Sequence, residues 1–207
     1  MAEYVAVADE DVDQSRRKFL TTATISVGAV GVAFAAVPFI ASWQPSERAR
    51  AQGVPTELDV SKLEAGQMAV VLWRKQPIYV VRRTQEMLAL LQNHNDRLKD
   101  PTSKDNIPSD QPEYTRNPDR SRTPAILVLI GICTHLGCLP KQRFAAGDAE
   151  LGAWWPGGFL CPCHGSRFDL AGRVFDGSPA SINLRIPPYS FSKETNLVIG
   201  VDEKGAA

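Results

Sequence analysis

Metal-binding side chains are concentrated in one short part of this sequence. The chain of 207 residues contains only four Cys and three His, and all four Cys and two of the His lie between Cys133 and His164. They form two clusters, Cys133-Thr-His135-Leu-Gly-Cys138 and Cys161-Pro-Cys163-His164-Gly-Ser166. Thiolate and imidazole ligands together suit zinc, copper or iron–sulfur sites. A metal site built from both clusters would constrain the fold more than any other feature of the sequence.

Three kinds of metal site compete for these residues. A four-cysteine zinc site would need a wider gap than the single residue between Cys161 and Cys163, since two to four residues usually separate zinc-binding cysteines. A plant-type ferredoxin cluster requires C-x4-C-x2-C, and Lys141 stands where its third cysteine should be. The remaining arrangement takes Cys-x-His from the first cluster and Cys-x-x-His from the second. In this arrangement Cys138 and Cys163 are not ligands.

The paired motifs C-T-H-L-G-C and C-P-C-H-G-S resemble those of Rieske proteins that carry an extra disulfide. The resemblance implies a [2Fe-2S] cluster and a mainly β fold, namely a Rieske-type antiparallel β sandwich with a cluster-binding subdomain. It assigns two cysteines to one iron and two histidines, which are also the expected catalytic residues, to the other: Cys133 and Cys161, then His135 and His164. It also pairs Cys138 with Cys163 in a disulfide, a bond that an oxidising compartment outside the cytoplasmic membrane permits.

The same resemblance gives roles to residues around the cluster. Ser166 would donate a hydrogen bond to the cluster, and Leu136 would shield it and help to shape a quinone-docking surface. Residues 177–180 resemble the proline loop that covers the cluster from a third side. Many respiratory relatives have a Tyr two residues after the Ser, whose OH bonds a ligand sulfur, whereas this chain has Phe168. The missing donor predicts a lower reduction potential, because hydrogen bonds to sulfur tune it.

The N-terminal segment predicts a membrane anchor. Residues 1–18 form a polar tail that ends in Arg16-Arg17-Lys18, and an uncharged, mostly apolar stretch follows. About 20 apolar residues cross the hydrocarbon core, so we expect residues 19–45 to form a transmembrane helix. The arginine pair resembles a twin-arginine export signal and also fits the positive-inside rule, and both interpretations place the N-terminus in the cytoplasm. A cleavable signal is the competing interpretation, which the length of the apolar run disfavours.

The rest of the chain predicts a linker and one mainly β domain. Residues 46–55 are expected to form a flexible linker, and residues 56–207 the periplasmic Rieske domain. We expect one helix from Thr84 to about Leu98, a long polar surface insertion at 99–123, and His94 at the surface or at the helix end. Strands are expected at Met68–Trp73, Ile78–Arg83, Ala125–Ile132, Ile182–Ile186 and Leu197–Val201.

Charge and resemblance together narrow the function. The 23 basic and 23 acidic residues give a formal net charge of zero, so the chain has no general electrostatic attraction to nucleic acid. The resemblance, from about Ser15 to Val201, implies the Rieske subunit of a bacterial ubiquinol–cytochrome c reductase. Such a subunit takes one electron from ubiquinol at cytochrome b and passes it to a c-type cytochrome, within a dimeric complex in the lipid bilayer of the inner membrane.

Three other functions compete with this one. The alternative is the Rieske small subunit of a periplasmic molybdenum oxidase such as arsenite oxidase, which can carry a similar export signal. A ring-hydroxylating dioxygenase component fits less well, because the chain has no room for a catalytic non-haem iron domain. A structural zinc module would be a colourless protein without redox activity.

Overall fold

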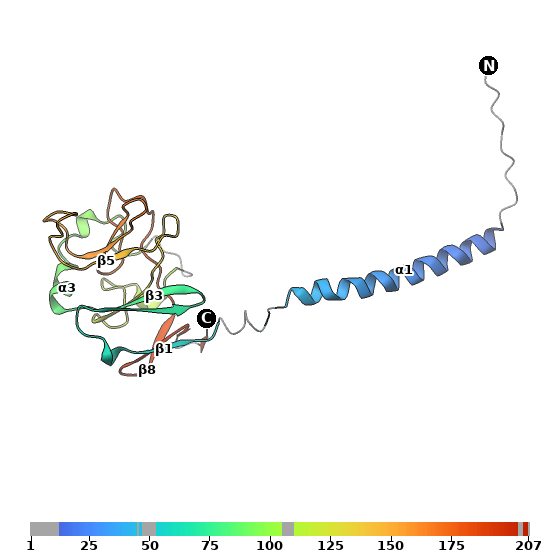
Figure 1. Ribbon diagram of the computed structural model, residues 1–207, viewed down its shortest axis with the longest axis horizontal. Helices are drawn as coiled ribbons and strands as arrows, with labels where there is room; N and C mark the ends of the chain where they lie inside the picture. The colour runs from blue at the N-terminus through green and yellow to red at the C-terminus, as the bar shows by residue number, and fades with distance from the viewer. Residues whose placement is uncertain (1–12, 45, 47–52, 105–109, 203–204, 207) are drawn as a thin grey trace, which may run out of the picture. The chain divides into compact units, whose positions relative to one another are not determined.

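The computed structural model describes residues 13–44, 46, 53–104, 110–202 and 205–206, and the chain divides into two units (Figure 1). The first unit spans residues 1–49 and the second spans residues 50–207. Residues 47–52 of the expected linker and residues 1–12 of the expected tail lie outside the described residues. The flexibility of the linker therefore stays a prediction.

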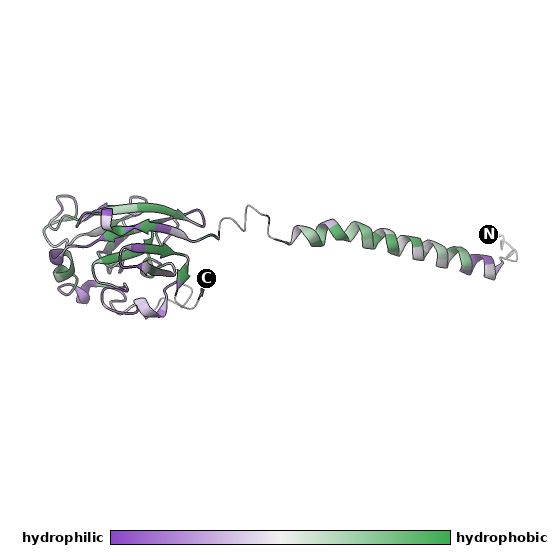
Figure 2. Ribbon diagram, turned by 90° about the horizontal axis from the view of Figure 1, so that it is seen from below, coloured by the Kyte–Doolittle hydropathy of each residue, from purple (hydrophilic) through white to green (hydrophobic). Residues whose placement is uncertain are grey.

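The first unit contains one long helix, α1 (Gln14–Ser42). Asp13 caps it, because its carboxylate accepts hydrogen bonds from the backbone N–H groups of Ser15 and Arg16 at 3.0 and 3.2 Å. Figure 2 shows that the helix is apolar along most of its length and polar at its N-terminal end, and none of its residues is buried. By length and composition α1 could span a membrane. The helix includes Arg16 and Arg17, and so begins before the expected span.

The second unit is built from antiparallel strands, which confirms the mainly β fold class. Its described residues form three three-stranded sheets and one two-stranded pair. The first sheet has the order β1 (Thr56–Asp59), β9 (Asn196–Ile199), β8 (Tyr189–Lys193). The second has the order β2 (Met68–Trp73), β3 (Gln76–Arg82), β4 (Ile126–Ile130), and the third β5 (Lys141–Arg143), β6 (Gly158–Leu160), β7 (Arg167–Asp169). The pair is β10 (Val201–Asp202) with β11 (Gly205–Ala206).

One hydrophobic core joins the three larger sheets. β3 and β4 are apolar runs buried over most of their length, as expected for strands covered on both faces. Figure 1 shows β3 between β5 on one side and β1 and β8 on the other. Phe159 and Phe168 bring the third sheet into the core, and both are fully buried. Each such side chain contributes about 1.5–3 kcal/mol of burial free energy, so the third sheet is held firmly against the other two.

The helix after β3 is shorter than expected. α3 (Gln85–Leu90) begins after Thr84, whose Oγ1 accepts the N–H of Met87 at 3.2 Å, and it does not continue to Leu98. Asn and Asp side chains favour caps and turns over helix interiors, and residues 93–96 contain three of them. The chain there forms the short 3-10 turn η2 (Asn95–Arg97); similar turns are η1 (Val60–Lys62) and η3 (Glu113–Thr115).

His94 was expected at the surface or at a helix end; the surface position is wrong, and the residue lies at a helix end, where it precedes η2 as its N-cap. Its exposed fraction is 6%, and its Nε2 lies 3.2 Å from Oδ2 of the fully buried Asp169 in β7. The same carboxylate oxygen accepts a hydrogen bond from Nε of Arg173 at 2.7 Å. Because a buried carboxylate is costly unless it is paired, these contacts explain the burial of His94.

The polar segment 99–123 is also less exposed than expected. Several of its polar side chains are buried, namely Asp100, Ser103, Gln111, Thr115, Arg120 and Ser121, whereas residues 105–109 lie outside the described residues. The guanidinium of Arg120 donates to the carbonyl oxygens of Ala171, Gly172 and Leu184 at 3.0, 3.1 and 2.7 Å. These hydrogen bonds replace the ones that the polar side chains would make to water, so the polar segment can be buried in the interior.

The expected strand Ile182–Ile186 is absent from the structure. Its backbone groups bond to three separate segments instead of one neighbouring strand. Leu184 N–H donates to Gly172 O, Ile130 N–H donates to Arg185 O, and Ile186 N–H donates to Asp110 O, each at 2.8 Å. Leu184 and Ile186 are buried as the sequence suggests, but no ladder forms because successive bonds go to different partners.

Candidate metal centre

Two loops of similar shape carry the predicted ligands. In the first, Cys133 N–H donates to Cys138 O at 2.7 Å and Gly137 N–H donates to Cys133 O at 3.0 Å. In the second, Cys161 N–H donates to Ser166 O at 2.8 Å and Gly165 N–H donates to Cys161 O at 3.0 Å. The two glycines have φ of 84° and 74°, a conformation that side chains disfavour, and open space surrounds both positions. Glycine is therefore required by the backbone and not by crowding.

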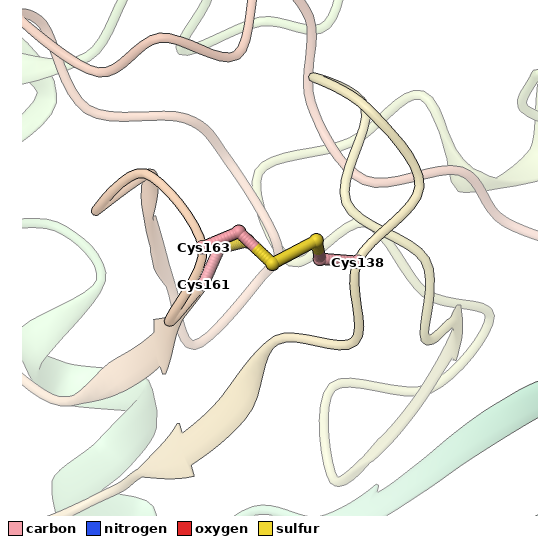
Figure 3. Close-up of side chains that lie close together, drawn as sticks. All are labelled: Cys138, Cys161 and Cys163. Carbon is pink, nitrogen blue, oxygen red and sulfur yellow. A yellow bond between two sulfur atoms is a disulfide. The ribbon is translucent and has the colours of Figure 1, made fainter.

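A disulfide joins the two loops, as predicted. Cys138 and Cys163 are bonded at an S–S distance of 2.02 Å, with their Cα atoms 6.6 Å apart (Figure 3). The sulfur of Cys161 lies within 4.8 Å of both, so three sulfurs are close together. This trio is not a ligand set, because two of its sulfurs are bonded to each other and only a thiolate binds metal strongly. It shows instead how close the disulfide lies to a predicted ligand.

The four remaining Cys and His side chains of the loops are available to a metal. Cys133 and Cys161 are free thiols with exposed fractions of 2% and 1%. The rings of His135 and His164 lie with centroids 4.8 Å apart at an interplanar angle of 85°. His164 is exposed and His135 half-buried. The thiols therefore face the interior, whereas the imidazoles lie toward the surface.

This donor set fits a cluster whose two irons have different ligands. The Nδ1 atom of His135 is buried and has no hydrogen-bond partner among the described residues. Such an atom is costly unless something binds it, and a metal ion would do so. Burial raises the pKa of the Cys133 thiol, while the backbone N–H of His135 and the Ser166 side chain lower it. A thiolate in such a buried place needs positive charge beside it, which ferric iron supplies. The assignment of individual ligands stays a prediction.

A third segment, residues 178–180, contacts the second loop. The N–H of Ala180 donates to Oγ of the fully buried Ser166 at 3.1 Å, and the N–H of Arg167 donates to Oγ of Ser178 at 3.1 Å. The first loop is bonded to a residue that follows this segment: Thr134 Oγ1 donates a hydrogen bond to the carbonyl oxygen of Ile182 at 2.7 Å. The segment that resembles the proline loop is thus bonded directly to the second loop.

The predicted site residues outside the ligand set differ in exposure. Leu136 projects into solvent with an exposed fraction of 71%, consistent with contact to another molecule. Phe168 in β7 is fully buried in the core that also contains Cys161. Thr134 stands in the first motif, but the motif gave it no role. Lys99, whose ammonium group bonds the third segment, lies outside both motifs. Their partners are far away in the sequence, so only the folded chain reveals them.

Comparison with known proteins decides the family. Residues 116–188 match the model of the Rieske [2Fe-2S] domain, and residues 7–46 match the model described as "Ubiquitinol-cytochrome C reductase Fe-S subunit TAT signal". The ubiquinol-cytochrome c reductase iron-sulfur subunit of Allochromatium vinosum is 51% identical over 203 residues, which are 98% of this chain and 97% of that relative. The chain belongs to the ubiquinol–cytochrome c reductase iron–sulfur subunit family.

Another member of this family and one solved structure are also similar to the chain. The iron-sulfur subunit of Rhodospirillum rubrum is 41% identical over 191 residues, covering 91% of this chain and 93% of that relative. A chain of the solved structure titled "Hyperthermophilic respiratory Complex III" is 26% identical with a TM-score of 0.46, covering 87% of this chain and 98% of that chain. The matches confirm the Rieske [2Fe-2S] cofactor and the twin-arginine signal, and α1 fits a membrane-anchored subunit.

Proposed function

We propose that this chain is the Rieske subunit of a bacterial cytochrome bc complex. It would take one electron and one proton from ubiquinol and pass the electron to a c-type cytochrome subunit, contributing to proton translocation. The observation that carries the proposal is the pairing of two buried free thiols with two imidazoles at the surface, in loops joined by a disulfide. The near full-length similarity to subunits named for ubiquinol–cytochrome c reductase supports it.

The two cysteines and the two histidines would have different roles in the site. Cys133 and Cys161 would hold one iron, and His135 and His164 the other. When bound, the cluster accepts and returns one electron at a potential above that of plant-type ferredoxins, because two neutral imidazoles replace two thiolates. The buried thiols keep water from one side of the site. Each histidine keeps a ring nitrogen that is not a ligand, and that nitrogen can accept the proton that accompanies the electron.

Residues beside the histidines would meet the partners. Leu136 is exposed next to His135, so it can press against an apolar wall of the quinol site on cytochrome b. His164 is also exposed, which leaves its ring edge accessible to an electron acceptor. We therefore assign one surface, made of Leu136, His135 and His164, to both partners. The two partners then bind in turn, and the linker 46–55 would provide the movement.

The location follows from the N-terminal segment. We propose that residues 19–45 cross the bacterial inner membrane once, with residues 1–18 in the cytoplasm and residues 56–207 in the periplasm. The match to a twin-arginine signal supports this orientation, and the Cys138–Cys163 disulfide is compatible with an oxidising compartment. The dimeric, multi-subunit state of the complex is part of the same proposal.

The alternative is the small subunit of a periplasmic molybdenum oxidase. Similarity over 98% of the chain to a quinol-oxidising family, including the signal segment, favours the bc complex. The two functions differ in their associated cofactors. Purification of the tagged chain from its native membrane should bring b- and c-type haem with it, whereas molybdenum without b-type haem would select the oxidase.

Electron paramagnetic resonance of reduced membranes tests the main proposal. We expect a Rieske-type signal whose shape shifts when quinone-site inhibitors are added. A signal insensitive to inhibitors would contradict quinol oxidation. Replacing both His135 and His164 by Ala should abolish the signal and the bound iron, whereas His94→Gln, which removes the third histidine, should leave both in place. Iron that survives the double replacement would refute the ligand assignment.

A further inference from the structure

Tyr79 lies in β3, outside both metal-binding motifs, and contacts three segments that lead into or out of the two loops. It is buried, with an exposed fraction of 6%. Its O–H donates to Pro140 O at 2.9 Å, and its ring stacks on that of Phe159 with centroids 5.9 Å apart at an interplanar angle of 20°. The ring also packs closely against the backbone of Gly131. Burial raises the pKa of the Tyr79 phenol above its ordinary value of 10.0, so the O–H remains a donor at neutral pH.

The close approach at Gly131 depends on the absence of a side chain there. A Cβ atom at residue 131 would overlap with Cε1 and Cζ of Tyr79 and would lie 2.7 Å from its Cδ1. The N–H of Gly131 donates to Pro77 O at 2.7 Å, so the backbone could not withdraw from the ring without losing this bond. The ring of Tyr79 and the backbone of Gly131 are therefore held in one arrangement.

The three contacts have the same position relative to the motif cysteines. Each lies two residues from one of them: Gly131 precedes Cys133, Pro140 follows Cys138, and Phe159 precedes Cys161. Tyr79 therefore contacts both ends of the first loop and the start of the second. The disulfide links the loops themselves, whereas Tyr79 links the segments that support them. Only one residue separates each contact from its cysteine, so a displacement at the contact also moves the cysteine.

We propose that Tyr79 is a positioning residue for the metal centre, which sets the spacing of the two ligand loops through its contacts with Gly131, Pro140 and Phe159. The proposal rests on the proposed cluster ligands but not on quinol oxidation. Donor atoms must be held within about 0.5 Å of the productive geometry, so the spacing of the loops decides how firmly iron is bound. Tyr79 acts through its three contacts and not through a bond to a ligand.

The expected effects follow from what each substitution removes. Tyr79→Phe keeps the ring and removes one buried hydrogen bond, and such a bond changes an equilibrium by about two- to tenfold. Iron leaves when the loops open, so a chelator should remove it about two- to tenfold faster from this variant. Tyr79→Val removes the ring and with it all three contacts, so iron should leave faster still. The Rieske-type electron paramagnetic resonance signal of this variant should also broaden, because the loops no longer have one spacing.

The test compares the rate of iron loss to a chelator and the shape of the resonance signal in the purified full-length chain. Every variant is measured at a temperature at which circular dichroism shows it folded. Tyr189→Phe is the matched control. Tyr189 is also fully buried, its hydroxyl accepts the N–H of Arg122 at 2.8 Å, and its ring contacts Tyr114 and Phe191 instead of a loop residue. This control should leave the rate and the signal unchanged, and equal acceleration by Tyr79→Phe and Tyr189→Phe would overturn the proposal.

A double-mutant cycle tests the contact with Gly131. Gly131→Ala should accelerate iron loss in the native chain, because its methyl group meets the ring of Tyr79. In a Tyr79→Val background the ring is gone, so the same substitution should have a much smaller effect. Equal effects in both backgrounds would contradict the shared contact. If Tyr79→Val does not retain the cluster, Tyr79→Phe and its control decide alone. Reduced thermal stability with an unchanged rate and signal would leave Tyr79 a purely structural residue and would overturn the proposal. A native chain without any Rieske-type signal would instead refute the proposed ligands.

Discussion

Removing the Cys138–Cys163 disulfide should destabilise the folded domain strongly. The two cysteines are 25 residues apart, and the chain-entropy model gives about 3.5 kcal/mol for closing a loop of that length. Cys138 is half-buried and Cys163 exposed, so replacing both by Ala leaves little cavity. The double variant Cys138→Ala/Cys163→Ala should therefore lose stability mainly because its unfolded chain gains freedom.

Guanidinium unfolding of the full-length, cluster-free chain in detergent measures this loss. The fluorescence of Trp155, which is 1% exposed in the same domain, reports the transition. Working without the cluster keeps metal affinity out of the comparison. Native chain treated with reductant is the matched control, since it should unfold at the same denaturant concentration as the variant. A loss below about 1 kcal/mol would refute the loop-closure argument.

Three further predictions concern other residues of the same domain. Phe168→Tyr should raise the midpoint potential by about 30–60 mV, because its added hydroxyl can donate to a ligand sulfur; an unchanged or lower value in voltammetry would contradict this. Burial by itself raises the pKa of Asp169, but Arg173 and His94 more than offset it and bring that pKa to about 2, below the ordinary 3.8. The stability that this carboxylate contributes is thus present above pH 4 and lost as pH falls toward 2. Asp169→Asn should lower the free energy of unfolding by about 3–5 kcal/mol. It should also weaken the fall in stability at acid pH, as measured by circular dichroism. Leu136→Ala should slow quinol oxidation in the purified complex while changing the free energy of unfolding by less than about 0.5 kcal/mol, and a large stability loss would show that Leu136 packs inside the domain.

Local patterns in the sequence predicted those parts of the structure that local patterns determine. The two loops follow short motifs, and bonds within each loop close their turns. The disulfide between the loops was implied by the resemblance of these motifs to those of Rieske proteins. Strand β2 matched its apolar run residue for residue, and β3, β4 and β9 differed from theirs only at the ends. In these segments side-chain preference and tertiary packing favour the same conformation.

Long-range contacts account for what the sequence did not predict. Residues 182–186 have the composition of a strand, but their backbone groups bond to three different segments. His94 is polar and follows a helix, and only its pairing with Asp169, distant in the sequence, shows why it is buried. Arg120 is likewise buried by bonds to carbonyl groups that lie far along the chain. No local pattern specifies these partners.

Backbone bonds within each loop close the turns at Cys133 and Cys161, the disulfide joins the two loops, and the sheets share a hydrophobic core. Each of these interactions is made between protein groups, whereas small zinc modules depend on metal ligation and are unfolded until metal arrives. Since protein bonds hold the loops in shape, little ordering entropy should oppose cluster assembly. We expect the chain to release its inorganic part on mild chelation, remain folded, and accept it again without rebuilding its sheets.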